Sequence, residues 1–184
     1  MSRDVWDSCV LADGVLAPLL LRLARAVEVP FKPLWTKRIL KETYRIQTGS
    51  LDWEPRRAMS FRASLSDQYP TNRVSGYERY LPLCRNGEPG GHVLACALAA
   101  RADKIVTHSL RNFRAERLAP WAGRVLHPDD YLLELYLLFP ECVLRILRAH
   151  EVATEELLST LAPHAPEFAK AVLADETHID GTLH

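Results

Sequence analysis

Two acidic side chains stand where the elements of an α/β protein would bring them together. Asp7 lies in the short apolar run Val5–Leu11, and Glu42 lies in the amphipathic stretch Lys37–Gln47. Cleaving a phosphodiester with a divalent metal requires several carboxylates in one place, because Mg²⁺ prefers oxygen ligands and retains the waters that supply the attacking group. In a parallel α/β sheet, such groups meet at the carboxyl edge. Asp7 and Glu42 are therefore the candidate catalytic and metal-ligating residues.

A second polar segment follows the short β-branched run Lys104–Thr107. A helix that leads into a strand ending in Thr, Ser and Asn delivers polar side chains to the same carboxyl edge, where ligands bind. The candidate substrate-binding residues at this edge are Thr107, Ser109 and Arg111.

Ordinary structural roles also explain these residues. Asp7 could be a loop or helix-capping acid, and Glu42 could be a solvated helix acid. A Ser/His nucleophile pair has little support because the sequence contains no nucleophile elbow. We expect His92 and His108 to pack or to cap near the sheet edge.

Several segments together resemble the PIN-domain family, the metal-dependent ribonuclease fold of VapC-type toxins. Val5–Leu11 is similar to the family's opening, in which an aspartate follows an apolar run, and Trp35–Glu42 is similar to its helix with a glutamate after Trp-x-x-x-Ile-Leu. Gly90–Ala95 resembles Asp-x-His-Val-Leu-Ala, and Ile105–Phe113 resembles Ile-Val-Thr-x-Asn-Leu-Arg-Asp-Phe. The closing motif at His127–Leu132 and the C-terminal helices resemble a longer VapC subgroup.

The resemblance implies that Asp7, Glu42, Gly90 and Asn112 converge, although Gly90 and Asn112 stand where the family has acids. Losing two carboxylates weakens the attraction for Mg²⁺, so we expect RNA cleavage to be impaired or lost. Glu88 is a candidate substitute ligand. The alternatives are a still-active endoribonuclease toxin that uses Mg²⁺ or Mn²⁺ with Asp7, Glu42 and Glu88, and a scaffold that dimerises through an apolar helical face.

Charge and composition limit the partners. The 184 residues include 23 Lys plus Arg and 23 Asp plus Glu, a net charge of zero, so no global field attracts a polyanion. Binding of RNA would need a local basic patch. The candidate patches are Arg56, Arg57 and Arg62, and Arg111, Arg114, Arg117 and Arg124. The resemblance adds an antitoxin-like DNA-binding protein and a second copy of the chain as expected partners.

The cysteines and the apolar segments indicate a cytoplasmic protein. Four cysteines follow no metal-binding spacing, so we expect buried free thiols. The apolar stretch of residues 15–24 is shorter than the about 20 residues that span a bilayer, so we expect no membrane association.

We expect a three-layer α/β/α PIN-like domain with a mainly parallel sheet over residues 1–130 and a helical C-terminal extension over residues 131–184. The expected strands are Val5–Val10, Leu34–Thr36, Ile105–Thr107 and Arg124–Leu126. The expected helices are Leu19–Ala26, Lys37–Gln47, Glu54–Arg62, Gly91–Arg101, Ala115–Ala119, two within Tyr131–His150 divided at Pro140, Thr154–Leu161 and Pro166–Leu173.

Overall fold

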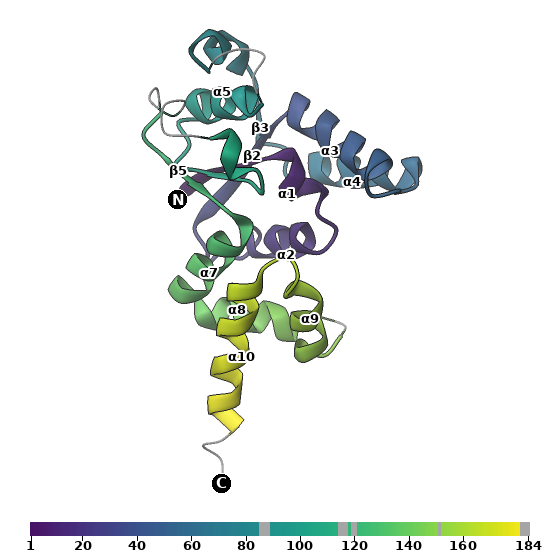
Figure 1. Ribbon diagram of the computed structural model, residues 1–184, viewed down its shortest axis with the longest axis vertical. Helices are drawn as coiled ribbons and strands as arrows, with labels where there is room; N and C mark the ends of the chain where they lie inside the picture. Colours follow the sequence, from purple (N-terminus) through teal and green to yellow (C-terminus); the bar gives the residue numbers. More distant parts are fainter. Residues whose placement is uncertain (85–88, 114–117, 119–120, 151, 181–184) are drawn as a thin grey trace. The chain divides into compact units, whose positions relative to one another are not determined.

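The computed structural model describes residues 1–84, 89–113, 118, 121–150 and 152–180, with side chains described as far as residue 175 (Figure 1). The strands are β1 (Ser2–Trp6), β2 (Phe31–Thr36), β3 (Arg73–Val74), β4 (Lys104–Val106) and β5 (Arg124–Leu126). The helices are α1 (Ser8–Ala12), α2 (Leu16–Leu23), α3 (Lys37–Gly49), α4 (Pro55–Gln68), η1 (Tyr77–Cys84), α5 (Gly91–Ala100), η2 (Leu110–Asn112), α7 (Pro128–Leu138), α8 (Pro140–Arg148), α9 (Thr154–Leu161) and α10 (Pro166–Asp180). The chain folds into two compact units, one of residues 1–13 and 31–127 and the other of residues 14–30 and 128–184.

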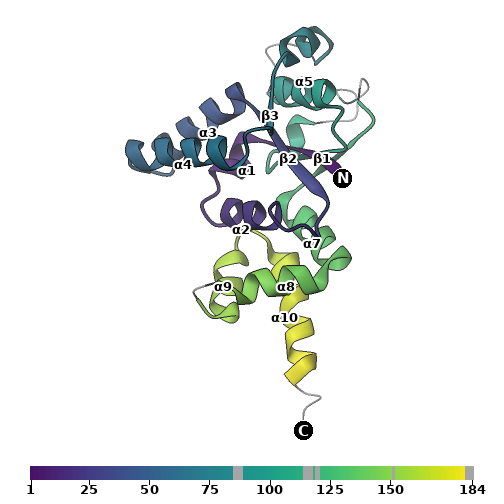
Figure 2. The ribbon, with the colours of Figure 1, turned by 180° about the vertical axis from the view of Figure 1, so that it is seen from behind.

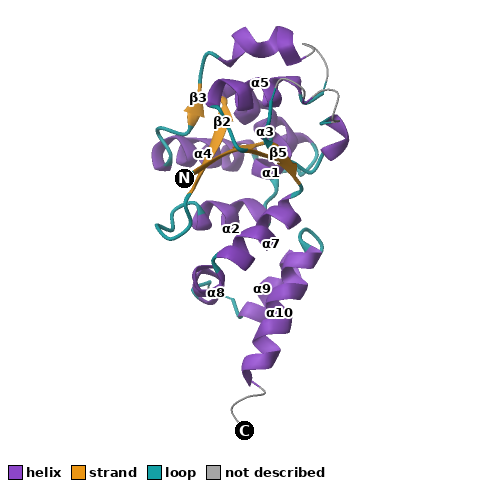
Figure 3. Cartoon of the chain, turned by 90° about the vertical axis from the view of Figure 1, so that its left-hand side faces the viewer, coloured by secondary structure: helices purple, strands orange, loops and turns teal. Residues whose placement is uncertain are grey.

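The first unit is built on a five-stranded sheet with the strand order β3-β2-β1-β4-β5. All four neighbouring pairs are parallel, and β1 lies beside β4 with Val5 opposite Ile105. The parallel sheet with its helices, followed by a helical C-terminal segment, confirms the expected fold class (Figure 3). The strand order reverses at β1, and ligands of open α/β sheets bind outside the carboxyl ends of the strands at such a point.

The first strand ends earlier than its apolar composition predicts. The expectation of a strand over Val5–Val10 is wrong, because β1 stops at Trp6 and α1 begins at Ser8. The Asp7 side chain caps this helix, and the backbone N–H groups of Val10 and Leu11 donate to the carbonyl oxygen of Asp7. A helix N-cap therefore overrides the strand propensity of the apolar run.

Local signals set the other elements around the site. Thr36 ends β2 and caps α3, since its Oγ1 accepts a hydrogen bond of 3.1 Å from the N–H of Ile39. Helix α4 begins at Pro55, one residue after the expected start at Glu54, and continues past the expected end at Arg62 to Gln68. Helix α5 packs on the sheet, and η1 packs on α5 (Figures 1 and 3). Apart from residue 118, the helix expected around residues 115–119 lies outside the described residues.

The second unit is helical in the part that the structure describes (Figure 2). Asp129, at the start of α7, accepts hydrogen bonds from the N–H groups of Glu167 and Phe168 and so caps α10. The ring of Tyr136 packs edge-on against Phe168. Helix α10 extends beyond the predicted end at Leu173, and residues 14–30 belong to this unit together with the C-terminal helices.

All four cysteines are free thiols, as predicted, and Cys9 alone is not fully buried. Burial raises the pKa of Cys96, within α5, to about 12. Among the described helices, none is both long and apolar enough to span a membrane.

Candidate functional site

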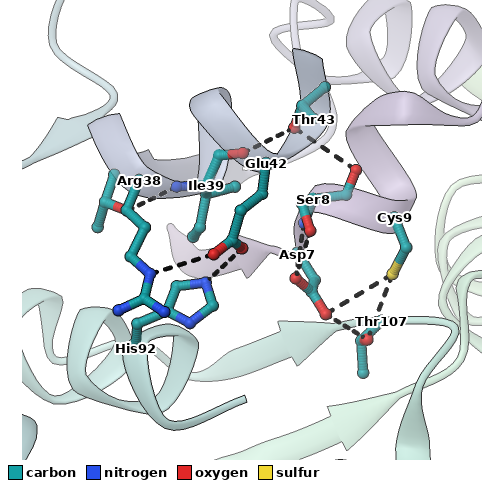
Figure 4. A network of polar contacts seen from close by, with 10 residues as sticks. Asp7, Ser8, Cys9, Arg38, Ile39, Glu42, Thr43, His92 and Thr107 are labelled. Atoms are coloured by element: carbon teal, nitrogen blue, oxygen red, sulfur yellow. Dashed lines mark hydrogen bonds and ion pairs between the residues drawn. The ribbon is translucent and has the colours of Figure 1, made fainter. Parts of the chain in front are cut away.

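Asp7 lies at the end of β1, between the start of α1 and the end of β4. Its Oδ1 accepts a hydrogen bond of 2.7 Å from the N–H of Ser8, and its Oδ2 accepts one of 2.7 Å from the hydroxyl of Thr107 (Figure 4). The parallel pairing of β1 with β4 sets up the second contact, because the N–H of Asp7 continues the ladder by donating to the carbonyl of Val106. Asp7 therefore caps a helix, as the structural alternative predicts, and also holds the ends of the two central strands together.

The thiol of Cys9 lies beside Asp7 and Thr107. Its Sγ is 3.6 Å from Oδ2 of Asp7 and 3.5 Å from Oγ1 of Thr107. Burial, and next the charge of Asp7, raise the pKa of Cys9 to about 11. Because the thiolate is the reactive form of cysteine, this thiol is unsuited to act as a nucleophile at neutral pH.

On α3, Glu42 is paired with the guanidinium of Arg38 and with the imidazole of His92. Its Oε1 accepts a hydrogen bond of 3.1 Å from Nε of Arg38, and its Oε2 lies 2.8 Å from Nε2 of the buried His92 (Figure 4). Burial raises the pKa of Glu42, but the hydrogen bond and charge of His92, followed by those of Arg38, outweigh burial and leave the pKa below its usual 4.5. Glu42 is therefore an ionised, charge-compensated carboxylate and not a solvated helix acid.

One cavity of about 400 Å³ brings the four motif positions together. Asp7, Glu42, Gly90 and Asn112 all line it, together with Ser109. They come from the end of β1, from α3, from the start of α5 and from η2, which follows β4. The structure thus brings together the positions whose convergence the resemblance implies.

The other candidate residues lie in different places. Thr107 is buried, and its hydroxyl donates to Asp7 while accepting a hydrogen bond of 3.0 Å from the N–H of Ser109. Arg111 is exposed and is not among the residues that line the cavity. Glu88 lies outside the described residues.

The backbone at Gly90 has a conformation that disfavours a side chain. Gly90 has a φ of +82°, in the left-handed region. A Cβ added there would lie 3.0 Å from Cζ of Phe113 and 3.3 Å from Cβ of Asn112. An aspartate in this position would strain the backbone and would require the Phe113 ring to move.

The donor set at the cavity fits Mg²⁺ or Mn²⁺ poorly. Hard divalent ions are held by several oxygen ligands, mainly carboxylates. Both carboxylates here already accept hydrogen bonds or ion pairs from protein groups. Among the described residues, no group of three or more His, Cys, Asp or Glu side chains is arranged to hold a metal ion. The described residues of the cavity therefore offer a divalent ion few oxygen ligands that are free of protein partners.

Sequence reasoning missed Arg38 and the pairing of His92. Arg38 stands four residues before Glu42 on one helix, a spacing that puts the two side chains on the same face. This signal was present in the sequence. The contact with His92 joins α3 to α5 and has no local sequence signal, because it depends on how the two helices pack.

Comparisons with known proteins identify one relative. The chain is 34% identical over 101 residues to the "Putative ribonuclease VapC50" of Mycobacterium tuberculosis. The match covers 51% of this chain and 60% of the relative, which is less than two thirds of its length. No family model matches the chain, and no solved structure matches it.

The match and the parallel sheet agree with the motifs along the chain. Together they support the expected resemblance: over the matched 101 residues the chain is similar to a VapC-type protein.

Proposed function

We propose that this chain is a VapC-type PIN protein that binds RNA and whose metal-dependent RNA cleavage is impaired or lost. The observation that carries the proposal is the pairing of Glu42 with Arg38 and His92 at 3.1 and 2.8 Å. A cation so close to the carboxylate offsets the attraction that the carboxylate would have for a divalent ion.

Gly90 and Asn112 support the same proposal. Neither residue contributes a negative charge, and both line the cavity where the resemblance places acids. Asp7 is then the one cavity carboxylate without a cation beside it among the described residues, and its two oxygens accept hydrogen bonds from Ser8 and Thr107. One such carboxylate is a weak site for Mg²⁺ or Mn²⁺, which bind through several oxygen ligands.

Binding of RNA needs no metal. Arg38, Ser109 and Asn112 present a cation and neutral polar groups at the cavity. Groups of this kind contact phosphate and sugar in nucleic-acid complexes. From the resemblance we also propose an antitoxin-like DNA-binding protein as partner, a cytoplasmic location and self-association as a homodimer. Co-expression with the product of the neighbouring reading frame tests the first partner, and light scattering tests the dimer.

The central test compares RNA cleavage and RNA binding in the same protein preparations. A labelled single-stranded RNA is incubated with the wild type and with Asp7→Asn at saturating Mn²⁺, and binding is followed by fluorescence anisotropy. We expect both proteins to bind the RNA and to cut it at the same background rate. Cleavage by the wild type that Asp7→Asn abolishes would establish the active endoribonuclease instead.

Restoring acids provides a gain-of-function test. Asn112→Asp changes one amide to a carboxylate of the same shape, and Arg38→Gln removes the cation from Glu42. We expect the double variant to bind Mn²⁺ more tightly than the wild type. Gly90→Asp needs a third change, Phe113→Leu, because the ring lies where the new Cβ would be.

A further inference from the structure

A basic groove lies at the start of α3. It has a volume of about 540 Å³, and its charged lining residues are Lys37, Arg38, Lys41, Arg73 and Glu78. Arg73 comes from β3, far along the chain, and the parallel pairing of β2 with β3 places it opposite Trp35, just before α3. Four cations and one carboxylate therefore face the groove, although the chain as a whole is neutral.

Three of these cations have no acidic partner among the described residues. Lys37, Lys41 and Arg73 are exposed, and within the described part of the chain none of them forms an ion pair with Asp or Glu. The fourth, Arg38, is paired with Glu42. The positive charge of the groove is thus available to a ligand.

The lysines lie near the N-terminus of α3, where a positive charge destabilises a helix. The first turn of α3 contains no acid and begins with Lys37 and Arg38. Cations are unfavourable near a helix N-terminus, because the macrodipole places partial positive charge there. Helix dipole and side chains therefore reinforce each other's positive potential, and a bound anion would relieve the repulsion.

We propose that this groove binds the phosphate groups of single-stranded RNA, an inference that rests on the proposed RNA binding. Phosphates need only cations, whereas protein partners are held chiefly by buried aromatic and apolar anchors. The apolar side chains of the groove are Val74 and the ring of Tyr77, which is only 8% exposed. Arg38 lines both this groove and the cavity of Asp7 and Glu42, so an RNA strand in the groove continues to that cavity.

The test measures the affinity for a labelled single-stranded RNA by fluorescence anisotropy at several salt concentrations. The groove variant carries Lys37→Gln, Lys41→Gln and Arg73→Gln and leaves Arg38 in place, so the contact with Glu42 is kept. The matched variant carries Arg56→Gln, Arg57→Gln and Arg62→Gln and removes the same charge from α4, where the sequence alone suggested a basic patch.

We expect the groove variant to bind about tenfold or more weakly at low salt, with a salt dependence reduced by about 2 in log–log slope for three lost phosphate contacts. The matched variant should change less. The groove variant should also unfold at the same or a higher temperature than the wild type. Removing the positive charges relieves their repulsion with the dipole of α3.

Two results would overturn the groove proposal, and they differ from each other. If the wild type binds RNA and the two variants lose affinity equally, or the groove variant loses none, then the groove is not the site while the proposed RNA binding stands. If the wild type binds no RNA even at low salt, the proposed function itself fails.

Discussion

Asp7 and Glu42 line the same cavity, yet neutral donors hold the first, whereas the Arg38 guanidinium and the His92 imidazole hold the second. A backbone N–H and the hydroxyl of Thr107 satisfy Asp7 and leave its charge in place. Arg38 and His92 satisfy Glu42 and offset its charge. The difference teaches that two carboxylates lining one cavity can differ in local charge, because the groups that accept or offset that charge come from different elements.

The largest effect is expected at Asp7, because its contacts join α1, β1 and β4. Asp7→Ala removes an N-cap, worth about 1 kcal/mol, and leaves the buried hydroxyl of Thr107 without its acceptor, at a cost of about 1–3 kcal/mol. We expect the free energy of unfolding in urea to fall by about 3 kcal/mol in total.

Asp7→Asn is the matched control, since asparagine caps helices well and its carbonyl oxygen can accept from Thr107. We expect this variant to lose about 1 kcal/mol or less. Equal losses in the two variants would mean that the charge of Asp7, and not its hydrogen bonds, stabilises the fold.

A smaller effect is expected at Gly90, where the cavity wall depends on a positive φ. Gly90→Ala should lower the free energy of unfolding by about 2 kcal/mol, because the left-handed conformation disfavours a Cβ and the ring of Phe113 crowds it. Gly49→Ala is the control: a Cβ at this helical position meets nothing within 4 Å, so it should be neutral or slightly stabilising. If Gly90→Ala left the free energy of unfolding unchanged, the proposed strain and crowding at this position would be refuted.

The smallest effect is expected at Glu42. Glu42→Gln should cost about 1 kcal/mol near neutral pH, because Arg38 is half-exposed and its ion pair is screened. The folded-state pKa of Glu42 is lowered, so its ionic contribution is present above the unfolded value and is lost as pH falls through the folded value. The advantage of the wild type over the variant should therefore shrink as the pH falls from neutral to below the usual glutamate pKa of 4.5.

Urea unfolding of both proteins across this range measures the difference. An advantage that persists undiminished at the acid end of this range would contradict the lowered pKa of Glu42 and its pairing with Arg38.

Local sequence signals predicted much of the fold. The strand Arg124–Leu126, the helix Thr154–Leu161 and the break at Pro140 all lie where the sequence indicates. The predicted end of the first strand was wrong. A single aspartate, Asp7, caps a helix that begins within the apolar run, so the strand stops before it. Boundaries set by one side chain in competition with its neighbours are difficult to read from composition.

The resemblance predicted which positions line the cavity, but it did not predict which charged groups pair with the carboxylates there. The four motif positions converge as implied, whereas the contact of His92 with Glu42 depends on the packing of α5 against α3. Arg73 reaches the basic groove only through the pairing of β3 with β2. Charge compensation between distant segments is a property of the folded chain, and no local pattern reports it.

Calorimetric titration of the wild type with Mn²⁺ tests the central claim most directly, with Asp7→Asn as reference. The account predicts no saturable site in the micromolar range, and titration curves for the two proteins that coincide, because Arg38 and His92 compensate Glu42 and two motif positions carry no acid. A micromolar site in the wild type that disappears in Asp7→Asn would contradict it.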